Sequence, residues 1–209
     1  MKQSVVITPP NFQVVEFYVK GTSPLVINKV SKKAKDAMKA RQEEGSVAKK
    51  GKKREAKDFN QCYNDARRIS EQGWDGITTS AFKNAMVSAC KIVGFAMTRA
   101  KLGIVKVLPD GIDREDAMPL VKIDGGIPTK IEMFVKNETG VADIRARPMW
   151  KEWECRLRVE YDADMFSTED IASLVSRAGA QVGVGEGRAD SPKSVGMGWG
   201  YFSISNEGE

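Results

Sequence analysis

The residues with the clearest chemical potential are a run of cations between Lys29 and Lys57. This segment carries twelve basic and four acidic residues, a formal charge of +8; the whole 209-residue chain carries +5, which leaves −3 for the remainder. Clustered lysines neutralise phosphates and release counterions without reading a base sequence, so the segment indicates a polyanionic partner. A solvated helix face followed by a soluble loop is the simpler alternative. The predicted contact residues are Lys32, Lys33, Lys35, Lys49, Lys50, Lys52, Lys53, Arg54 and Lys57.

A second stretch is a series of glycines over residues 183–200. Closely spaced glycines let a backbone lie against a ligand or against another backbone, and their amides can form anion-binding nests. The stretch lacks the Gly-Lys-Ser/Thr ending of a P-loop, and it follows a predicted helix rather than a strand, which argues against a dinucleotide fingerprint. We expect a loop that contacts phosphates, with a flexible hairpin as the alternative. The predicted contacts are Gly183, Gly185, Gly187, Arg188 and Lys193.

Two shorter stretches add polar and aromatic side chains. Ser80 is predicted to cap a helix. The free backbone amides of the first turn, together with Lys83, are a candidate anion site, and plain helix capping is the alternative. Arg145 and Arg147 precede Trp150, and such a group can hold a phosphate while the indole stacks on a base. The sequence leaves open whether Trp150 is exposed or buried.

The absence of histidine excludes several kinds of active site. It removes the Ser-His-Asp triad, the Cys-His pair, histidine metal ligands and a histidine general acid or base. The three cysteines are far apart, so we expect buried thiols in a reducing compartment, and no metal site or cofactor. The unfavoured catalytic alternative is a carboxylate-dependent metal nuclease that would use Asp110, Asp113, Glu115 and Asp116. Since no apolar run approaches the ~20 residues of a membrane span, we expect a cytoplasmic protein with no membrane partner.

The elements that would position these residues alternate between strands and helices. Strands are predicted over 12–19, 102–108, 156–161 and 199–204, with shorter ones over 120–123 and 131–135. Helices are predicted over three segments, which begin at Ser31, Ser80 and Ser167 and end before Gly45, Gly94 and Gly179. Residues 45–58 have almost no apolar side chains, so we expect a flexible basic insertion there. The order fits a single α+β domain over 1–209, with an antiparallel sheet and a ferredoxin-like or RNA-recognition-motif-like β-α-β-β-α-β core.

These stretches, in this order, resemble the RAMP (repeat-associated mysterious protein) superfamily, RNA-recognition-motif-fold proteins that include the CRISPR backbone subunits. The helix entry ITTSAFKNAM is similar to the family's I-P-G-S-S-L-K-G element, and its matches are Ile77, Ser80 and Lys83. Its departures are Thr78, Thr79 and Asn84. The opening FYVKGTSPLVI and the glycine-rich ending are similar to the family's first strand and C-terminal loop. The chain is also similar to small stand-alone phage and mobile-element proteins with a Lys-rich insertion.

The resemblance implies a protein that binds single-stranded RNA or DNA, with RNA favoured, and that stacks head-to-tail as a homo-oligomer or as a subunit of a nucleoprotein complex. It also implies that the basic insertion curls over the strand like a thumb. RAMP nucleases cut RNA with a histidine or with an aspartate in the loop after the first strand. This chain has no histidine and no aspartate over 21–30, so we expect no catalysis. The alternative is an inhibitor or decoy that binds, or takes the place of, a subunit of a host nucleoprotein complex.

Overall fold

A computed structural model describes residues 8–30, 35–36, 39–40, 58–136, 142–191 and 196–205. Residues 45–57 of the predicted insertion lie outside this part of the chain. So does most of the helix predicted from Ser31, in which residues 35–36 and 39–40 are helical. The predicted contact residues that lie outside the described residues are Lys32, Lys33, Lys49, Lys50, Lys52, Lys53, Arg54, Lys57 and Lys193.

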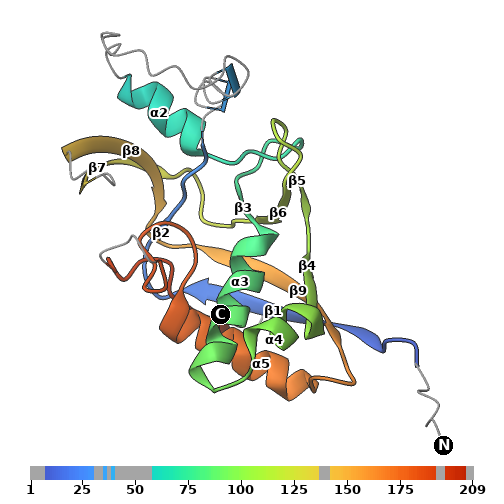
Figure 1. Ribbon diagram of the computed structural model, residues 1–209. Helices are drawn as coiled ribbons and strands as arrows, with labels where there is room; N and C mark the ends of the chain where they lie inside the picture. The colour runs from blue at the N-terminus through green and yellow to red at the C-terminus, as the bar shows by residue number, and fades with distance from the viewer. Residues whose placement is uncertain are drawn as a thin grey trace, which may run out of the picture.

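The main sheet is antiparallel, with the strand order β10–β1–β9–β4 (Figure 1). Its strands are β1 (Phe12–Gly21), β4 (Ile104–Leu108), β9 (Glu154–Asp162) and β10 (Phe202–Ser205). Every second side chain of β9 is buried, the period of a strand with one face in the core. The other face of β1 and β9 is called the open face below, and it carries Phe12, Val14 and Tyr18 as well as charged side chains. Its charged members include Glu16, Lys20, Glu154, Arg156 and Arg158.

Helices cover the core face of this sheet (Figure 1). They are α3 (Thr79–Ile92), α4 (Met97–Gly103) and α5 (Thr168–Arg177). The apolar positions of α3 are buried as their helical spacing predicts, and the Phe82 ring packs edge-on against Phe202 of β10 with centroids 5.7 Å apart. Ser167 caps α5 and forms a reciprocal capping box with Asp170, which confirms the start predicted for this helix.

Two smaller antiparallel sheets lie at one end of the main sheet (Figure 1). One has the order β2–β8–β7, with β2 (Leu25–Val26), β7 (Thr129–Lys136) and β8 (Ala142–Trp150). The other has the order β3–β6–β5, with β3 (Gly76–Thr78), β5 (Gly111–Ile112) and β6 (Pro119–Lys122). Helix α2 (Phe59–Ala66) packs against β8, and the Tyr63 hydroxyl donates a hydrogen bond to the Pro128 carbonyl at 2.7 Å. These sheets carry residues of the site described below.

Several boundaries differ from the sequence prediction. The strand predicted from Leu102 begins at Ile104, because Leu102 and Gly103 end α4, which the sequence did not reveal. Strand β8 was not predicted at all. The N-cap of α3 is Thr78 rather than Ser80. Helix α5 does not stop at Gly179 but continues as a π-helical turn (Ala178–Val182), where a Cβ on Gly179 would collide with the Phe202 carbonyl.

The described residues therefore form an α+β structure with antiparallel sheets, as predicted from the alternation of strands and helices. Cys90 and Cys155 are buried free thiols, and Cys62 is half-buried. No helix in the described ranges is long and apolar enough to span a membrane.

Candidate functional site

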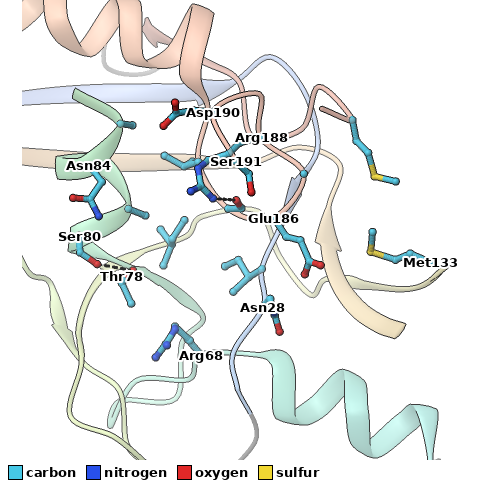
Figure 2. A pocket seen from close by; sticks show the side chains of 18 of the residues that line it. Asn28, Arg68, Thr78, Ser80, Asn84, Met133, Glu186, Arg188, Asp190 and Ser191 are labelled. Carbon is cyan, nitrogen blue, oxygen red and sulfur yellow. Dashed lines mark hydrogen bonds between the residues drawn. The ribbon is translucent and has the colours of Figure 1, made fainter. Parts of the chain in front are cut away.

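An open cleft of about 990 Å³ lies where the first turns of α3, the chain after β2, the β7–β8 pair and the glycine-rich loop meet. Figure 2 shows α3 on one side of it, the glycine-rich loop above and Arg68 at the opposite end. The predicted site residues that line this cleft are Ser80, Arg145, Gly185, Gly187 and Arg188. Their three sequence stretches therefore meet at one place.

The start of α3 gives the cleft a polar wall. Thr78 ends β3 with an extended backbone, and the helix begins at the next residue without a side-chain cap on its amides. The Ser80 hydroxyl donates a hydrogen bond to Thr78 Oγ1 at 3.2 Å, and both side chains line the cleft (Figure 2). The Asn84 amide follows one turn later on the same side. These hydroxyl and amide groups are suited to hydrogen bonding with a polar ligand.

The glycine-rich loop is held by its backbone against the chain around β2. The Glu186 amide donates to the Val26 carbonyl at 2.8 Å, and the Gly200 amide donates to the Pro24 carbonyl at 2.8 Å. Gly185 has φ +82°, and a Cβ there would collide with the Val26 carbonyl. Gly183 is buried against the Trp199 carbonyl and does not line the cleft. The glycines thus serve close packing of backbone on backbone, and this packing sets the position of the cleft wall.

Three arginines from separate elements line the cleft. Arg188 donates from Nη1 to the Gly185 carbonyl at 3.0 Å, and no ion pair joins it to a carboxylate of the described residues. Arg145 on β8 lies 3.7 Å from the Asp143 carboxylate, at the long end of ion-pair distances. Arg68, which follows α2, was not selected from the sequence, where it has no motif around it.

Apolar side chains form part of the cleft as well. Phe134 on β7 is 65% exposed, and Met197 of the glycine-rich loop is 45% exposed. A large exposed aromatic ring beside arginines is a surface on which a base can stack. The sequence predicted a strand here, but it gave no signal that Phe134 would point to solvent.

Three other predicted contacts have structural roles instead. Trp150 is 1% exposed, and its Nε1 donates to the Gly126 carbonyl at 3.1 Å, so it is not available for stacking. Arg147 is buried, and its Nε donates to Glu186 Oε2 at 2.7 Å, which ties β8 to the glycine-rich loop. Lys83 points to the main sheet and donates to the Val105 carbonyl, and burial lowers its pKa. Long-range contacts with Gly126, Glu186 and Val105 determine these orientations, which residue type alone does not show.

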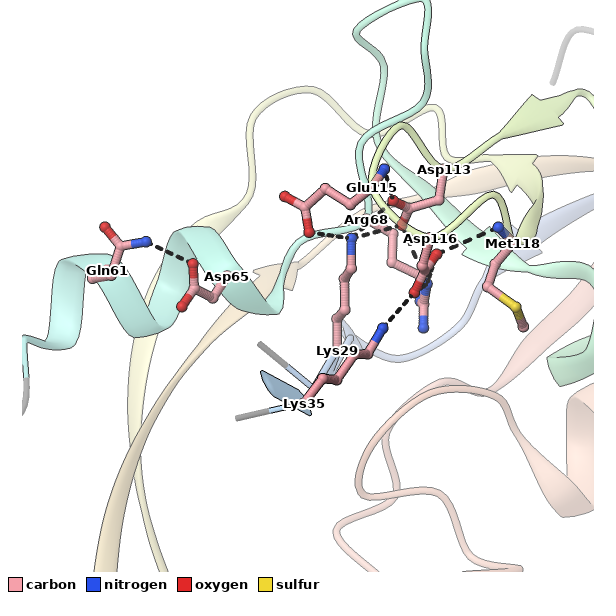
Figure 3. Close-up of polar contacts among 9 residues, drawn as sticks. All are labelled: Lys29, Lys35, Gln61, Asp65, Arg68, Asp113, Glu115, Asp116 and Met118. Atoms are coloured by element: carbon pink, nitrogen blue, oxygen red, sulfur yellow. Dashed lines mark hydrogen bonds and ion pairs between the residues drawn. The ribbon is translucent and has the colours of Figure 1, made fainter. Parts of the chain in front are cut away.

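The acidic residues proposed for a metal nuclease are neutralised by cations (Figure 3). Asp113 binds Lys29 at 2.8 Å and Arg68 at 3.2 Å, Asp116 binds Lys35 at 2.9 Å, and Glu115 binds Lys29 at 2.8 Å. Asp110 binds Arg158 at 3.1 Å. In the part of the chain that the structure describes, no three acidic or thiol side chains are grouped to hold a metal ion.

The ion pairs also join two stretches that the sequence presents separately. Lys29 and Lys35 belong to the basic segment, and their partners lie in the turn after β5. Burial disfavours the charged form of Lys29, but hydrogen bonds to Asp113 and Glu115 outweigh it and raise its pKa. Partial burial of Asp116 is likewise outweighed by Lys35 and Arg68, so the pKa of this carboxyl is lowered.

The comparisons with known proteins give no family for this chain. No protein-family model matches it, and no curated protein matches it. The function is therefore inferred from the residues of the cleft.

Proposed function

We propose that this protein binds single-stranded nucleic acid in the cleft, without catalysis, and that it favours RNA over DNA. The observation that carries the proposal is that predicted contacts from three separate stretches line one cleft. They are Ser80 at the start of α3, Arg145 on β8 and Arg188 in the glycine-rich loop. Charged donors of this kind hold phosphates, and they are joined here by an exposed aromatic ring.

The lining residues are suited to different parts of a bound strand: phosphates, bases and sugars. Arg188 is the first phosphate-binding group, because no carboxylate of the described residues pairs with it. Arg145 is the second, because its single carboxylate partner lies at the long distance of 3.7 Å. Phe134 is the stacking surface for a base whose neighbours are unpaired. Ser80 and Asn84 are suited to the ribose 2′-hydroxyl, which favours RNA. A duplex does not offer a free base face, so single strands are preferred.

In this proposal the basic segment attracts the nucleic acid electrostatically over long range. Ile27 and Asn28 line the cleft immediately before Lys29, where the segment begins. Its charge is +8 and that of the remainder is −3, so we expect phosphate chains to be attracted to this segment rather than to the molecule as a whole.

The strand order supports assignment of the main sheet to a ferredoxin-like core. The chain runs β1, α3, β4, β9, α5 and β10, and the sheet order is β10–β1–β9–β4. Within this proposal the protein is a RAMP-like member of that class, able to stack head-to-tail along the strand. The open face, where an RNA-recognition motif presents aromatic rings, carries Phe12 and Tyr18, but its arginines are tied up in a ladder of ion pairs. We therefore assign binding to the cleft.

Fluorescence anisotropy with labelled 20-nucleotide RNA, DNA and duplex DNA across a salt series tests the proposal. We expect RNA to bind more tightly than single-stranded DNA, and duplex to bind least. The logarithm of the binding constant should fall linearly with the logarithm of salt, with a slope of about −0.7 for each phosphate neutralised. No binding at low salt, or binding without a salt dependence, would overturn the proposal.

A companion variant tests the basic segment. Replacing Lys49, Lys50, Lys52, Lys53 and Arg54 with alanine should weaken binding equally for all base sequences, because these cations act on phosphates. Unchanged affinity would remove the segment from the mechanism while leaving the cleft in place.

A further inference from the structure

The turn after β5 contacts both the basic segment and the cleft. Its carboxylates hold two lysines at the beginning of the basic segment and one arginine of the cleft wall (Figure 3). Arg68 Nη1 lies 3.2 Å from Asp113 Oδ2 and 3.3 Å from both carboxylate oxygens of Asp116. Asp116 also accepts a hydrogen bond from Lys35 Nζ at 2.9 Å. Two cations suited to a phosphate are therefore already occupied by a carboxylate of the same chain.

The inner and outer parts of this network differ in burial. The Lys29 and Asp113 side chains are 2% and 0% exposed, whereas those of Lys35 and Asp116 are 45% and 17% exposed. A buried ion pair is costly to break, since each partner would be left as an uncompensated charge. A pair with one partner in solvent is worth about 1 kcal/mol or less. The Lys35–Asp116 contact can thus be exchanged while the inner pair keeps the beginning of the segment in place. Arg68 and Asp116 are only 14% and 17% exposed, but Arg68 keeps Asp113 as a partner at 3.2 Å when Asp116 leaves.

We propose that Asp116 is an internal competitor for the polyanion, which a bound strand displaces from Arg68 and Lys35. This inference rests on the proposed function. Arginine binds carboxylates and phosphates with the same fork of donors, so one group can replace the other without a change of fold. The Lys29–Asp113 pair stays formed and holds the chain beside the cleft. A strand with several phosphates can displace Asp116, whereas a single phosphate group lacks the additional contacts needed to do so.

Two variants that remove the same charge separate this local effect from a change in net charge. Asp116→Asn removes the competitor and keeps an oxygen that can accept the hydrogen bond from the Met118 amide. Asp124→Asn is the matched control, because Asp124 is also paired with a lysine, Lys122, but borders the open face. Binding of a 20-nucleotide RNA should tighten about fivefold in Asp116→Asn and should change less than twofold in Asp124→Asn.

A double-mutant cycle identifies the cation that is released. If Asp116 holds Lys35, then Lys35→Gln should weaken RNA binding more in the Asp116→Asn background than in the wild-type protein. Equal effects in the two backgrounds would overturn the proposal. The wild-type protein offers a measurement that does not depend on the folding of a variant. The carboxyl ¹³C resonance of Asp116 should titrate at a higher pH when RNA is bound, because Lys35 and Arg68 no longer hold the carboxylate.

The outcomes distinguish failure of this inference from failure of the proposed function. If the wild-type protein binds RNA and Asp116→Asn binds no more tightly than Asp124→Asn, the competitor is overturned and the function stands. An unchanged Asp116 titration on RNA binding would overturn it as well. If none of the three proteins binds RNA, both proposals fall. Tighter binding confined to Asp116→Asn would support both.

Discussion

The cleft and the open face of the main sheet both carry arginines, but the two surfaces differ in how those arginines are paired. On the open face Arg156 lies 3.9 Å from Glu16 and 3.8 Å from Asp110, and Arg158 lies 3.1 Å from Asp110. In the cleft Arg188 binds a backbone carbonyl and has no carboxylate partner among the described residues. Arg145 lies 3.7 Å from one carboxylate, that of Asp143, and Arg68 at the far end is paired with Asp113 and Asp116. A cation that already has a carboxylate partner gains little from a phosphate, because it must give up the first interaction.

The difference indicates that a count of the cations on a surface does not give the number that are free of a carboxylate partner. The open face lies on the broadest sheet, yet its arginines are already paired with carboxylates of the same chain. The cleft differs in having one arginine, Arg188, with no carboxylate partner among the described residues, beside the exposed ring of Phe134. Within the proposed function, pairing rather than net charge distinguishes the cleft from the open face.

The largest expected effect comes from removing two of the three cleft arginines, Arg145 and Arg188. The double substitution Arg145→Ala and Arg188→Ala should weaken RNA binding about 100-fold at low salt, or about 2.7 kcal/mol, since each charged hydrogen bond contributes about 1.5 kcal/mol. The salt slope should become shallower by about 1.4, because two phosphate contacts are lost. Anisotropy across a salt series measures both quantities.

The matched control removes the same charge from the open face. Arg156→Ala with Arg158→Ala should change RNA affinity less than threefold, because these side chains are engaged with Glu16 and Asp110. If the two double variants weakened binding equally, the distinction between the surfaces would be wrong.

The next largest effect concerns the backbone that shapes the cleft wall. Gly185→Ala should lower the free energy of unfolding by about 2 kcal/mol or more, because alanine is strained at positive φ and its Cβ would meet the Val26 carbonyl. Gly73 has φ +89°, but no atom lies near its Cβ position, so Gly73→Ala should cost about 1 kcal/mol. Urea denaturation compares the two, and equal losses would contradict the close packing of the loop.

A smaller effect is expected from the exposed ring. Phe134→Ala should weaken binding of single-stranded RNA about tenfold, near 1.4 kcal/mol, which is within the range for loss of one base stack. Ile127→Ala serves as the control, because Ile127 is exposed but does not line the cleft. A loss common to both variants would point to general surface effects rather than to stacking.

The smallest expected effect is a pH dependence of the free energy of unfolding, caused by Asp116 in the turn after β5. The folded-state pKa of Asp116 lies below its ordinary value of 3.8, despite partial burial, because Lys35 and Arg68 stabilise the carboxylate. Its contribution to stability is therefore present above pH 3.8 and is lost as the pH falls through the folded-state pKa. Between pH 6 and acidic conditions, wild-type protein should lose up to about 1 kcal/mol more than Asp116→Asn. Urea denaturation at each pH checks the sign, and a larger loss in the variant would contradict it.

The alternation of strands and helices was predictable from the sequence, because buried apolar residues recur at the spacing of a strand or of a helix. The Ser167 capping box and the buried stripe of α3 were both predictable from local spacing. Strand β8 was missed, because Arg147 and Pro148 are unusual in a strand. Arg147 is buried there only through its ion pair with Glu186, a contact between positions far apart in the sequence.

The sequence predicted which stretches contribute residues to the cleft, but not how their side chains are arranged. The prediction included Arg145 and Arg188, yet it also included Trp150, whose burial depends on packing beneath Gly125 and Gly126. The clearest omission was Arg68, which no motif marks. Its place in the cleft follows from contacts between the chain after α2 and the turn after β5, such as the hydrogen bond from the Arg114 amide to the Ile69 carbonyl. Such long-range contacts leave no local signal.

The most direct test of the central claim is photo-crosslinking of the wild-type protein to a 20-nucleotide RNA that contains 4-thiouridine, with the adducts located by mass spectrometry. Binding in the cleft predicts adducts on peptides that contain Phe134 or Met197, reduced by competition with unlabelled RNA and by high salt. Adducts concentrated on the open-face strands β1 and β9, or adducts insensitive to competitor, would contradict the account.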